Sequence, residues 1–325
     1  MMNKLKQVIL LLLVVGLVAG CGGGSQQVPV IGIVSFGPDP ATERAVRGIK
    51  EGLKELGYEE GENIHFEYND AQGDLATIQP IVQKYVADKV DIIVPLTTPC
   101  LIATANVVEG TDRIVVFTEV YDPYAAGVAV SPTEHSPNLV GVASPPPVDP
   151  VLDIMAQLMP EARRIGTIYN AGEPNAVSAV TRIRAGTAER GLELVERTVA
   201  GSSEVHQAAQ SLVGRVDAFL ITGDNTVSMS FEAVVGTAEA AGIPIFVNDS
   251  AWVERGAMVG FGPDFYEAGR AAAKMIAEIL QGADPAEMEI QELDVQRMIV
   301  NLDAAQRQGI TLPQELIEQA DQVIQ

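Results

Sequence analysis

The sequence is poor in the residues on which disulfide formation, metal binding and much of catalysis depend. Its 325 residues include 2 cysteines, 3 histidines and 1 tryptophan, and 21 basic residues stand against 43 acidic ones. So few cysteines exclude a disulfide framework, and a net charge of −22 argues against binding to nucleic acid or to anionic lipid. His65, His135 and His206 are scattered without metal-ligand spacing. We therefore expect no metal and no cofactor, and interpret the acidic charge as a means of solubility.

A long apolar run lies at the N-terminus. Lys4 and Lys6 precede it, it covers residues 8–18, and it ends in Leu17-Val18-Ala19-Gly20-Cys21. The run is shorter than the about 20 residues that span a bilayer, and its order of charged, apolar and small residues is that of a signal peptide. A cysteine directly after the cleavage site resembles the lipobox of bacterial lipoproteins. The resemblance implies cleavage before Cys21 and a lipid on its sulfur.

The leader sets the expected location of everything that follows it. Residues 1–20 are predicted to be a lipoprotein signal peptide, and residues 21–27, rich in Gly, Ser and Gln, a flexible tether. The remaining chain is then an exported domain outside the cytoplasm, in the periplasm or at the cell surface, attached to the membrane only through lipid. Cys100 is left without a partner, and we interpret it as a small helix residue rather than an activated thiol.

Past the tether, apolar segments of strand length alternate with amphipathic segments of helix length. The predicted strands cover residues 30–36, 64–69, 90–96 and 114–118, and the predicted helices 40–56, 74–88 and 99–108. Continuous apolar strands between helices indicate a parallel sheet that is covered on both faces.

The same order of segments then repeats. Residues 31–40 align without a gap with residues 165–174, at an offset of 134, which places Asp39-Pro40 opposite Glu173-Pro174 at two helix starts. A later strand repeats at an offset of 126. Parallel strands resemble one another by chance, but the preserved order and the two acid–proline pairs favour a true repeat.

We therefore predict an α/β fold of two similar lobes, each a parallel sheet flanked by helices, joined by a hinge with several crossings. Residues 28–142 plus about 258–283 are assigned to lobe 1, and residues 143–257 plus about 284–325 to lobe 2. A final helix, Phe265–Leu280, and a tail with a helix over residues 313–324 lie beyond a full second unit.

Polar and aromatic residues follow the predicted strands, where ligands bind in open parallel sheets. The candidate ligand-binding residues are Phe36, Thr97, Thr98, Pro99, Tyr121 and Asp122 in the first unit and Tyr169, Asn170, Glu173, Asn175, Asp224, Asn225 and Asp249 in the second.

Each candidate also has a structural interpretation. Asp39, Glu173 and Thr98 stand at helix starts, where a plain N-cap contributes about 1 kcal/mol, and for Asp39 we favour the cap. Asp224 either caps its helix or, with Glu173, holds an ammonium group. Aromatic candidates such as Tyr121 either pack within their loops or stack on a flat ligand.

The turn Thr97-Thr98-Pro99 is the more informative candidate. Proline at a helix start leaves N–H groups and the positive end of the helix dipole free, which suits a carboxylate. The offset of 126 places Thr98 and Asp224 at corresponding strand ends. Two facing lobes would therefore offer one site for each charged group of a zwitterion.

Several motifs together resemble those of ABC-transporter substrate-binding lipoproteins, and more closely those of tryptophan/tyrosine-type binding proteins. They are Gly48–Gly57, Asn69–Asp74, Val116–Thr118, Asp122–Gly127, Tyr169–Asn175, Ser202–Val205, Gln207–Gly214 and Asp224–Val227. The resemblance implies a class I periplasmic-binding-protein-like fold and an amino acid ligand, commonly aromatic. It also implies delivery of this ligand to a membrane permease that is driven by a cytoplasmic ATPase. We expect the exported domain to act as a monomer.

Other functions remain open at this point. A two-lobed domain also serves as a ligand-sensing module for a membrane receptor or kinase, and the cleft of such a domain also takes a sugar or a nucleoside. An enzyme is disfavoured, because no Ser-His-Asp set can be assembled from the loops at the strand ends.

Overall fold

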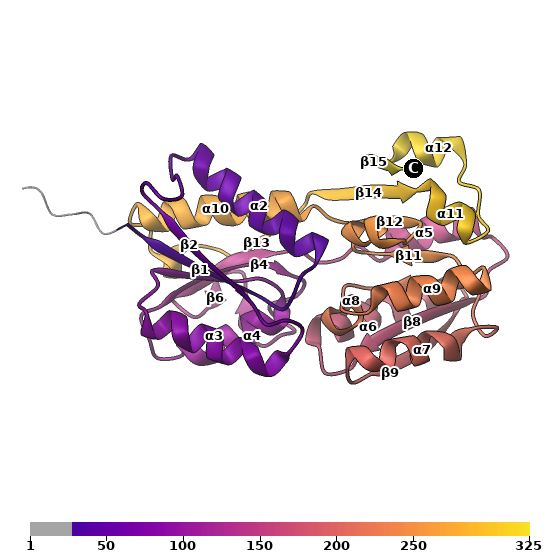
Figure 1. Ribbon diagram of the computed structural model, residues 1–325, viewed down its shortest axis with the longest axis horizontal. Helices are drawn as coiled ribbons and strands as arrows, with labels where there is room; N and C mark the ends of the chain where they lie inside the picture. The colour runs from indigo at the N-terminus through magenta and orange to yellow at the C-terminus, as the bar shows by residue number, and fades with distance from the viewer. Residues whose placement is uncertain (1–27) are drawn as a thin grey trace, which may run out of the picture.

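The computed structural model describes residues 28–325, so the predicted leader, the lipidation site Cys21 and the whole tether lie outside the described residues. Two lobes lie end to end, each with a β-sheet covered by helices (Figure 1). Within residues 28–325, no helix combines the length and the apolar character needed to cross a membrane.

Lobe 1 is built on a parallel sheet of six strands in the order β13-β7-β4-β3-β1-β2. The strands are β1 (Val30–Ser35), β2 (His65–Asp70), β3 (Ile92–Pro95), β4 (Ile114–Val120), β7 (Leu139–Ala143) and β13 (Gln291–Glu292). The helices are α2 (Pro40–Glu55), α3 (Leu75–Ala87), α4 (Thr98–Val108), α10 (Phe265–Leu280) and the short η3 (Pro285–Glu287). A separate antiparallel pair consists of β5 (Ala129–Ser131) and β6 (Glu134–His135). The central strands are almost wholly apolar because helices bury both of their faces.

Lobe 2 has a sheet of seven strands in the order β15-β14-β12-β11-β10-β8-β9, parallel except where β12 meets β14. The strands are β8 (Arg164–Asn170), β9 (Glu193–Val199), β10 (Ala218–Ile221), β11 (Ile245–Val247), β12 (Val259–Pro263), β14 (Gln296–Asn301) and β15 (Gln322–Ile324). The helices are α5 (Asp149–Leu158), α6 (Pro174–Glu189), η1 (Ser202–Glu204), α7 (Val205–Leu212), α8 (Asn225–Ser228), α9 (Phe231–Ala241), η2 (Ser250–Arg255), α11 (Leu302–Arg307) and α12 (Gln314–Gln319).

The internal repeat is visible in the architecture. Helices α2 and α6 each begin at the proline of the acid–proline pair and each contain 16 residues. Strands β1 and β8 precede them in the two sheets, at the same offset of 134. The two lobes therefore present equivalent loops at the carboxyl ends of their strands.

The chain crosses between the lobes between β7 and α5, between β12 and α10, and between β13 and β14. Two segments belong to the lobe opposite to the predicted one. Residues 259–263 form β12, which pairs with β11 and β14 in lobe 2, and residues 291–292 form β13, which pairs with β7 in lobe 1. The predicted helix over residues 313–324 is also too long, because α12 ends at Gln319 and residues 322–324 pair with β14.

Helix α10 returns to lobe 1 and lies along α2 (Figure 1). A Cβ atom on Gly48 would lie 2.1 Å from the carbonyl oxygen of Tyr266, and one on Gly269 would lie 2.1 Å from the carbonyl oxygen of Ala45. The two glycines thus allow backbone-to-backbone contact between the helices. This contact fixes the position of α2, whose N-terminus faces the other lobe.

We expect Gly269→Ala to lower the free energy of unfolding by about 2–3 kcal/mol, because an added methyl group forces the two backbones apart. The matched control is Gly236→Ala in α9, where a Cβ atom would meet nothing within 4 Å. That substitution should be neutral or stabilising by up to about 1 kcal/mol. Urea unfolding of both variants measures the difference, and equal stability would contradict the close contact.

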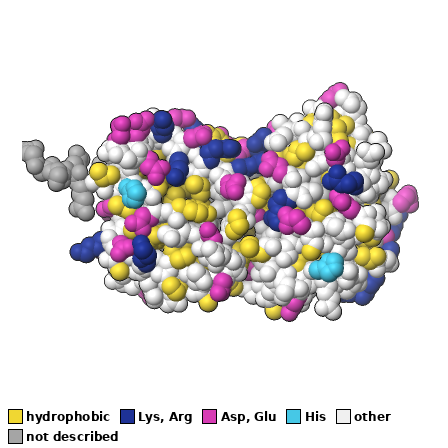
Figure 2. All heavy atoms as spheres, viewed as in Figure 1, with side chains coloured by type: hydrophobic (Ala, Val, Ile, Leu, Met, Phe, Trp, Pro, Cys, Tyr) yellow, Lys and Arg dark blue, Asp and Glu magenta, His cyan; other side chains and the backbone are white. Residues whose placement is uncertain are grey.

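Over the face shown in Figure 2, acidic and basic side chains are interspersed. The excess of acidic residues therefore does not gather there into one acidic patch. This distribution agrees with a role of the negative charge in solubility.

Candidate functional site

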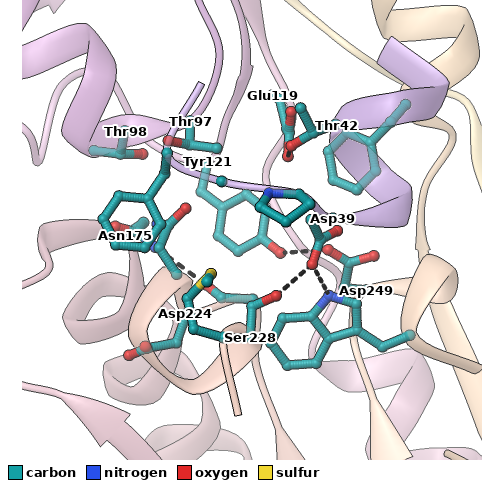
Figure 3. A pocket seen from close by; sticks show the side chains of 18 residues that line it. Asp39, Thr42, Thr97, Thr98, Glu119, Tyr121, Asn175, Asp224, Ser228 and Asp249 are labelled. Atoms are coloured by element: carbon teal, nitrogen blue, oxygen red, sulfur yellow. Dashed lines mark hydrogen bonds between the residues drawn. The ribbon is translucent and has the colours of Figure 1, made fainter. Parts of the chain in front are cut away.

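A cleft lies between the lobes, where the loops at the carboxyl ends of β1, β3 and β4 face those that follow β10 and β11 (Figure 3). The cavity that remains between the lobes has a volume of about 40 Å³. Lobe 1 lines it with Phe36, Gly37, Pro38, Asp39, Thr42, Thr97, Thr98, Glu119, Tyr121 and Phe265, and lobe 2 with Asn175, Gly223, Asp224, Asn225, Ser228, Met229, Asp249 and Trp252.

Most of the residues predicted from the strand ends meet in this cleft. Those that line it are Phe36, Thr97, Thr98, Tyr121, Asn175, Asp224, Asn225 and Asp249. These residues meet because parallel strands present the loops at their carboxyl ends along one edge of the sheet, and their role in ligand binding stays a prediction.

Three predicted residues lie elsewhere. The hydroxyl of Tyr169 donates to Glu196 on β9, 2.9 Å away, and so points away from the cleft. Asp122 accepts a hydrogen bond from the Ser178 hydroxyl at 3.0 Å and joins the lobes at their seam. Pro99 lines a neighbouring groove.

Glu173 and Asn170 support the cleft from behind. The Oε1 atom of Glu173 accepts from the N–H and hydroxyl of Thr226 at 2.9 and 2.7 Å, and its Oε2 atom accepts from the N–H and side-chain amide of Asn225 at 2.9 and 2.7 Å. The side-chain amide of Asn170 donates to the Thr226 hydroxyl at 2.9 Å. Glu173 therefore holds the start of α8 in place and has no acceptor left for a ligand ammonium group, contrary to the prediction.

Asp224 caps α8, which was one of its two predicted roles. Its Oδ1 atom accepts from the Val227 N–H at 2.8 Å and its Oδ2 atom from the Asn170 N–H at 2.6 Å. Burial, followed by the charge of Glu173, raises the pKa of Asp224, while these N–H groups oppose the shift. Asp224 lines the cleft, but its carboxylate is engaged by the backbone of its own lobe.

The acidic groups with spare acceptors are Glu119 and Asp249. The Oε1 atom of Glu119 accepts from the Thr42 hydroxyl at 2.9 Å, and its Oε2 atom is buried without a hydrogen-bond partner. The Tyr121 hydroxyl lies 3.4 Å from Oδ2 of Asp249. Burial, followed by the charge of Asp39, raises the pKa of Glu119 well above its usual range and that of Asp249 to about 7. No lysine, arginine or histidine is among the residues that line the cleft, so this cluster is suited to a cation.

The start of α4 forms another part of the cleft wall, which offers hydrogen-bond donors where Glu119 and Asp249 offer acceptors. No side chain caps this helix, and the hydroxyls of Thr97 and Thr98 are buried without hydrogen-bond partners. Thr97 has φ +76°, and Glu119, near the end of the adjacent strand, has φ +59°. For a β-branched residue such as Thr97 a positive φ is a clear outlier, and strained conformations of this kind cost about 1–3 kcal/mol and cluster at functional sites. The free helix start is suited to an anion.

Several residues of the cleft were not among the candidates predicted from the sequence. They are Gly37, Pro38, Asp39, Thr42, Glu119, Gly223, Ser228, Met229, Trp252 and Phe265. Asp39, Glu119 and Trp252 lie at or just after the ends of strands. The rule that ligands bind at the carboxyl ends of parallel strands could therefore have identified them. Ser228 ends a helix of 4 residues and Met229 follows it, and the sequence contains no clear signal for so short a helix.

The raised pKa values predict a dependence of stability on pH. A carboxyl group whose folded pKa exceeds its unfolded pKa binds more protons in the folded state, so stability falls as the pH rises through that window. We expect the free energy of unfolding to decrease by roughly 2 kcal/mol from about pH 5 to about pH 8. Thermal unfolding at a series of pH values tests this, and Glu119→Gln should flatten the profile. A wild-type profile that rises over the same range would contradict the expectation.

The sequence of this chain is similar to those of known proteins. A sequence profile of the family described as ABC transporter substrate binding protein matches residues 27–324. A tyrosine-binding protein of Clostridioides difficile (strain R20291) is 32% identical over 273 residues, which cover 84% of this chain and 79% of that protein.

Two solved structures of similar proteins allow the relative arrangement of the two lobes to be compared. An ABC domain from Streptococcus pneumoniae in complex with L-Trp has a TM-score of 0.86 at 27% identity, covering 91% of this chain and 99% of that one. The ligand-free, open structure of a substrate-binding protein with adhesive properties from Clostridium difficile has a TM-score of 0.69 at 31% identity, with coverages of 91% and 99%. The lobes of this chain are therefore arranged more as in the L-Trp complex than as in the open structure. Hydrogen bonds join them across the cleft, which is closed in this sense.

Proposed function

Because this chain belongs to the family of ABC-transporter substrate-binding proteins, we propose that it captures an α-amino acid, preferably an aromatic one, for an ABC importer. Members of the family bind solutes outside the cytoplasm and are not enzymes. In this proposal the protein is held at the membrane by lipid on Cys21 and delivers its ligand to a permease with a cytoplasmic ATPase.

The proposal rests above all on the distribution of charge in the cleft. Glu119 offers a carboxylate oxygen without a partner, and Asp249 offers one whose contact with the Tyr121 hydroxyl is long, at 3.4 Å. The uncapped start of α4, with the hydroxyls of Thr97 and Thr98, offers donors on another side. A zwitterion satisfies both, since its ammonium group requires acceptors and its carboxylate requires donors. A neutral sugar would leave the buried carboxylates without a counter-charge.

The remaining walls favour an aromatic side chain. Phe36, Tyr121, Trp252 and Phe265 line the cleft from both lobes, and aromatic rings prefer stacked or edge-to-face neighbours. The two related proteins described above, a tyrosine-binding protein and a complex with L-Trp, support the same class of ligand.

A thermal-shift screen tests the ligand class. The common amino acids, pentoses and nucleosides are added separately, and a ligand at 100 times its Kd should add about 2.7 kcal/mol to the free energy of unfolding. For L-tyrosine, two analogues isolate the charged groups: tyramine lacks the carboxylate, and 3-(4-hydroxyphenyl)propionate lacks the ammonium group. Each should bind about 100-fold more weakly. Stabilisation by a sugar or nucleoside and by no amino acid would reject the proposal.

The anchor and the transport role have their own tests. In cells, Cys21→Ser should leave the precursor uncleaved at this position and unlabelled by radioactive fatty acid, and labelling that persists would reject Cys21 as the site. Loss of the protein should abolish uptake of the identified amino acid. Unchanged uptake together with altered signalling through a membrane kinase would favour the sensor function instead.

A further inference from the structure

One oxygen of Asp39 receives hydrogen bonds from three residues of the opposite lobe. Asp39 precedes α2 in lobe 1, and its Oδ2 atom accepts from the Ser228 hydroxyl (Figure 3) and from the Trp252 indole N–H at 3.1 Å. The same oxygen accepts from Arg255 Nη1 at 3.3 Å. Its Oδ1 atom accepts from the N–H of Ala41 at 2.8 Å and caps α2. Three donors from lobe 2 thus share Oδ2, which has two lone pairs and so no acceptor left for a ligand.

The donors are held in place within lobe 2. The Arg255 guanidinium donates to both carboxylate oxygens of Glu232, at 2.8 and 2.9 Å, and to the carbonyl oxygen of Ser228 at 2.6 Å. It also lies over the rings of Phe231 and Trp252, 5.4 and 5.8 Å from their centroids. All of these contacts join residues of lobe 2, so the receptor for Asp39 does not depend on lobe 1 for its shape.

Closing the cleft also brings like charges together. Asp39 and Glu119 approach from lobe 1 and Asp249 from lobe 2, and the charge of Asp39 disfavours ionisation of the other two. Arg255 pairs with Asp39 across the lobes and with Glu232 in its own lobe, and the charge of Arg44 offsets only part of the effect of Asp39 on Asp249. The carboxylates of Glu119 and Asp249 therefore oppose closure until a cation enters.

We propose that Asp39 is a positioning residue that latches the closed lobes by docking into the site formed by Ser228, Trp252 and Arg255, without contacting the ligand. Ligand binding relieves the repulsion between the lobes, and the latch then holds the closed state and slows release. The link to an amino acid rests on the proposed function, whereas the latch itself does not.

The test compares Asp39→Asn with Asp74→Asn. Asparagine caps helices as well as aspartate does, and Asp74 caps α3 through the same type of bond, to the N–H of Ala76 at 2.9 Å, on an exposed surface. In Asp39→Asn, a side-chain N–H group replaces the oxygen that accepts from lobe 2, so donors would face donors. With L-tyrosine as the probe, stopped-flow measurements should show release about 10- to 100-fold faster from Asp39→Asn and unchanged from Asp74→Asn. Equal release rates in both variants would overturn the latch.

The only tryptophan of the sequence, Trp252, gives a second readout. Its side chain is 2% exposed in the closed state, so acrylamide should quench its fluorescence more strongly in Asp39→Asn than in Asp74→Asn, with L-tyrosine present. If Asp39→Asn binds L-tyrosine weakly yet protects Trp252 as the wild type does, Asp39 contacts the ligand and the latch is rejected.

The latch and the ligand proposal fail in different ways. If L-tyrosine and the other amino acids do not bind the wild-type protein, the proposed function fails. The latch is then judged without ligand on variants that also carry Asp249→Asn, which removes a repelling carboxylate and lets the lobes close. In this background Asp39→Asn should expose Trp252 to acrylamide more than Asp74→Asn does. Identical quenching there would reject the latch independently of any ligand.

Discussion

Gly223→Ala is expected to weaken ligand binding by about 30-fold or more while both lobes stay folded. Gly223 lies in the loop between β10 and α8, and Tyr121 of lobe 1 packs directly on it. A Cβ atom at position 223 would lie 1.8 Å from the Tyr121 hydroxyl oxygen and 2.5 Å from Cζ of the ring. The ring is rigid and only 6% exposed, so the methyl group has to displace it or keep the lobes apart.

The effect should appear in closure and not in folding, because the clash joins residues of different lobes. Calorimetric titration with the ligand from the screen measures the affinity, and urea unfolding without ligand measures the stability. Gly201→Ala is the control, since that loop glycine of lobe 2 has open space around it and an extended backbone with φ −161°. Wild-type affinity in Gly223→Ala would show that Tyr121 moves aside and that the contact does not limit closure.

The repeated architecture could be predicted because its signals are local. Asp39-Pro40 and Glu173-Pro174 mark the first residues of α2 and α6, and the apolar runs before them form β1 and β8. Proline at the first helical position and an acidic residue before it are favourable wherever the helix packs. Such signals survive in the sequence independently of tertiary contacts.

The assignment of the crossing segments depends on contacts that no local pattern encodes. Strand β12 and helix α10 adjoin in the sequence, yet β12 pairs with β11 in lobe 2 while α10 packs on α2 in lobe 1. An apolar pentapeptide has the same pattern in either sheet. The close approach of Gly48 and Gly269 holds α10 on lobe 1, the lobe to which the sequence analysis assigned it, whereas β12 was assigned to the wrong lobe.

The loops that form the candidate site could be predicted from the sequence, but the roles of individual side chains were predicted less well. Asp39 was interpreted as a cap and Glu173 as a ligand partner. In the structure Asp39 caps α2 with one oxygen and joins the lobes with the other, while Glu173 supports α8 of its own lobe. The same acid–proline motif therefore has a different role in each lobe. The role depends on which residues lie within hydrogen-bond distance of the carboxylate, and the motif itself does not determine these residues.

Asp249→Asn is expected to lower the affinity for an amino acid by about 30- to 1,000-fold and to raise the stability of the ligand-free protein. The Oδ1 atom of Asp249 accepts from the N–H of Ala251 at 3.0 Å and caps η2, a bond that asparagine preserves. The substitution removes one of the carboxylates that face each other across the cleft. The ammonium group loses a counter-charge, while the repulsion with Asp39 and Glu119 decreases.

A lower affinity together with a higher stability of Asp249→Asn distinguishes a ligand-binding role from a structural one. A residue that only supports the fold would lose stability when replaced, and affinity would fall along with it. The control is Asp284→Asn, because Asp284 caps η3 through the same bond, to the N–H of Ala286 at 3.0 Å, on an exposed surface. Calorimetric titration and thermal unfolding of both variants give the two quantities. Unchanged affinity in Asp249→Asn would assign the ammonium group to another carboxylate of the cleft, and Glu119, whose second oxygen has no partner, would then be the residue that holds it.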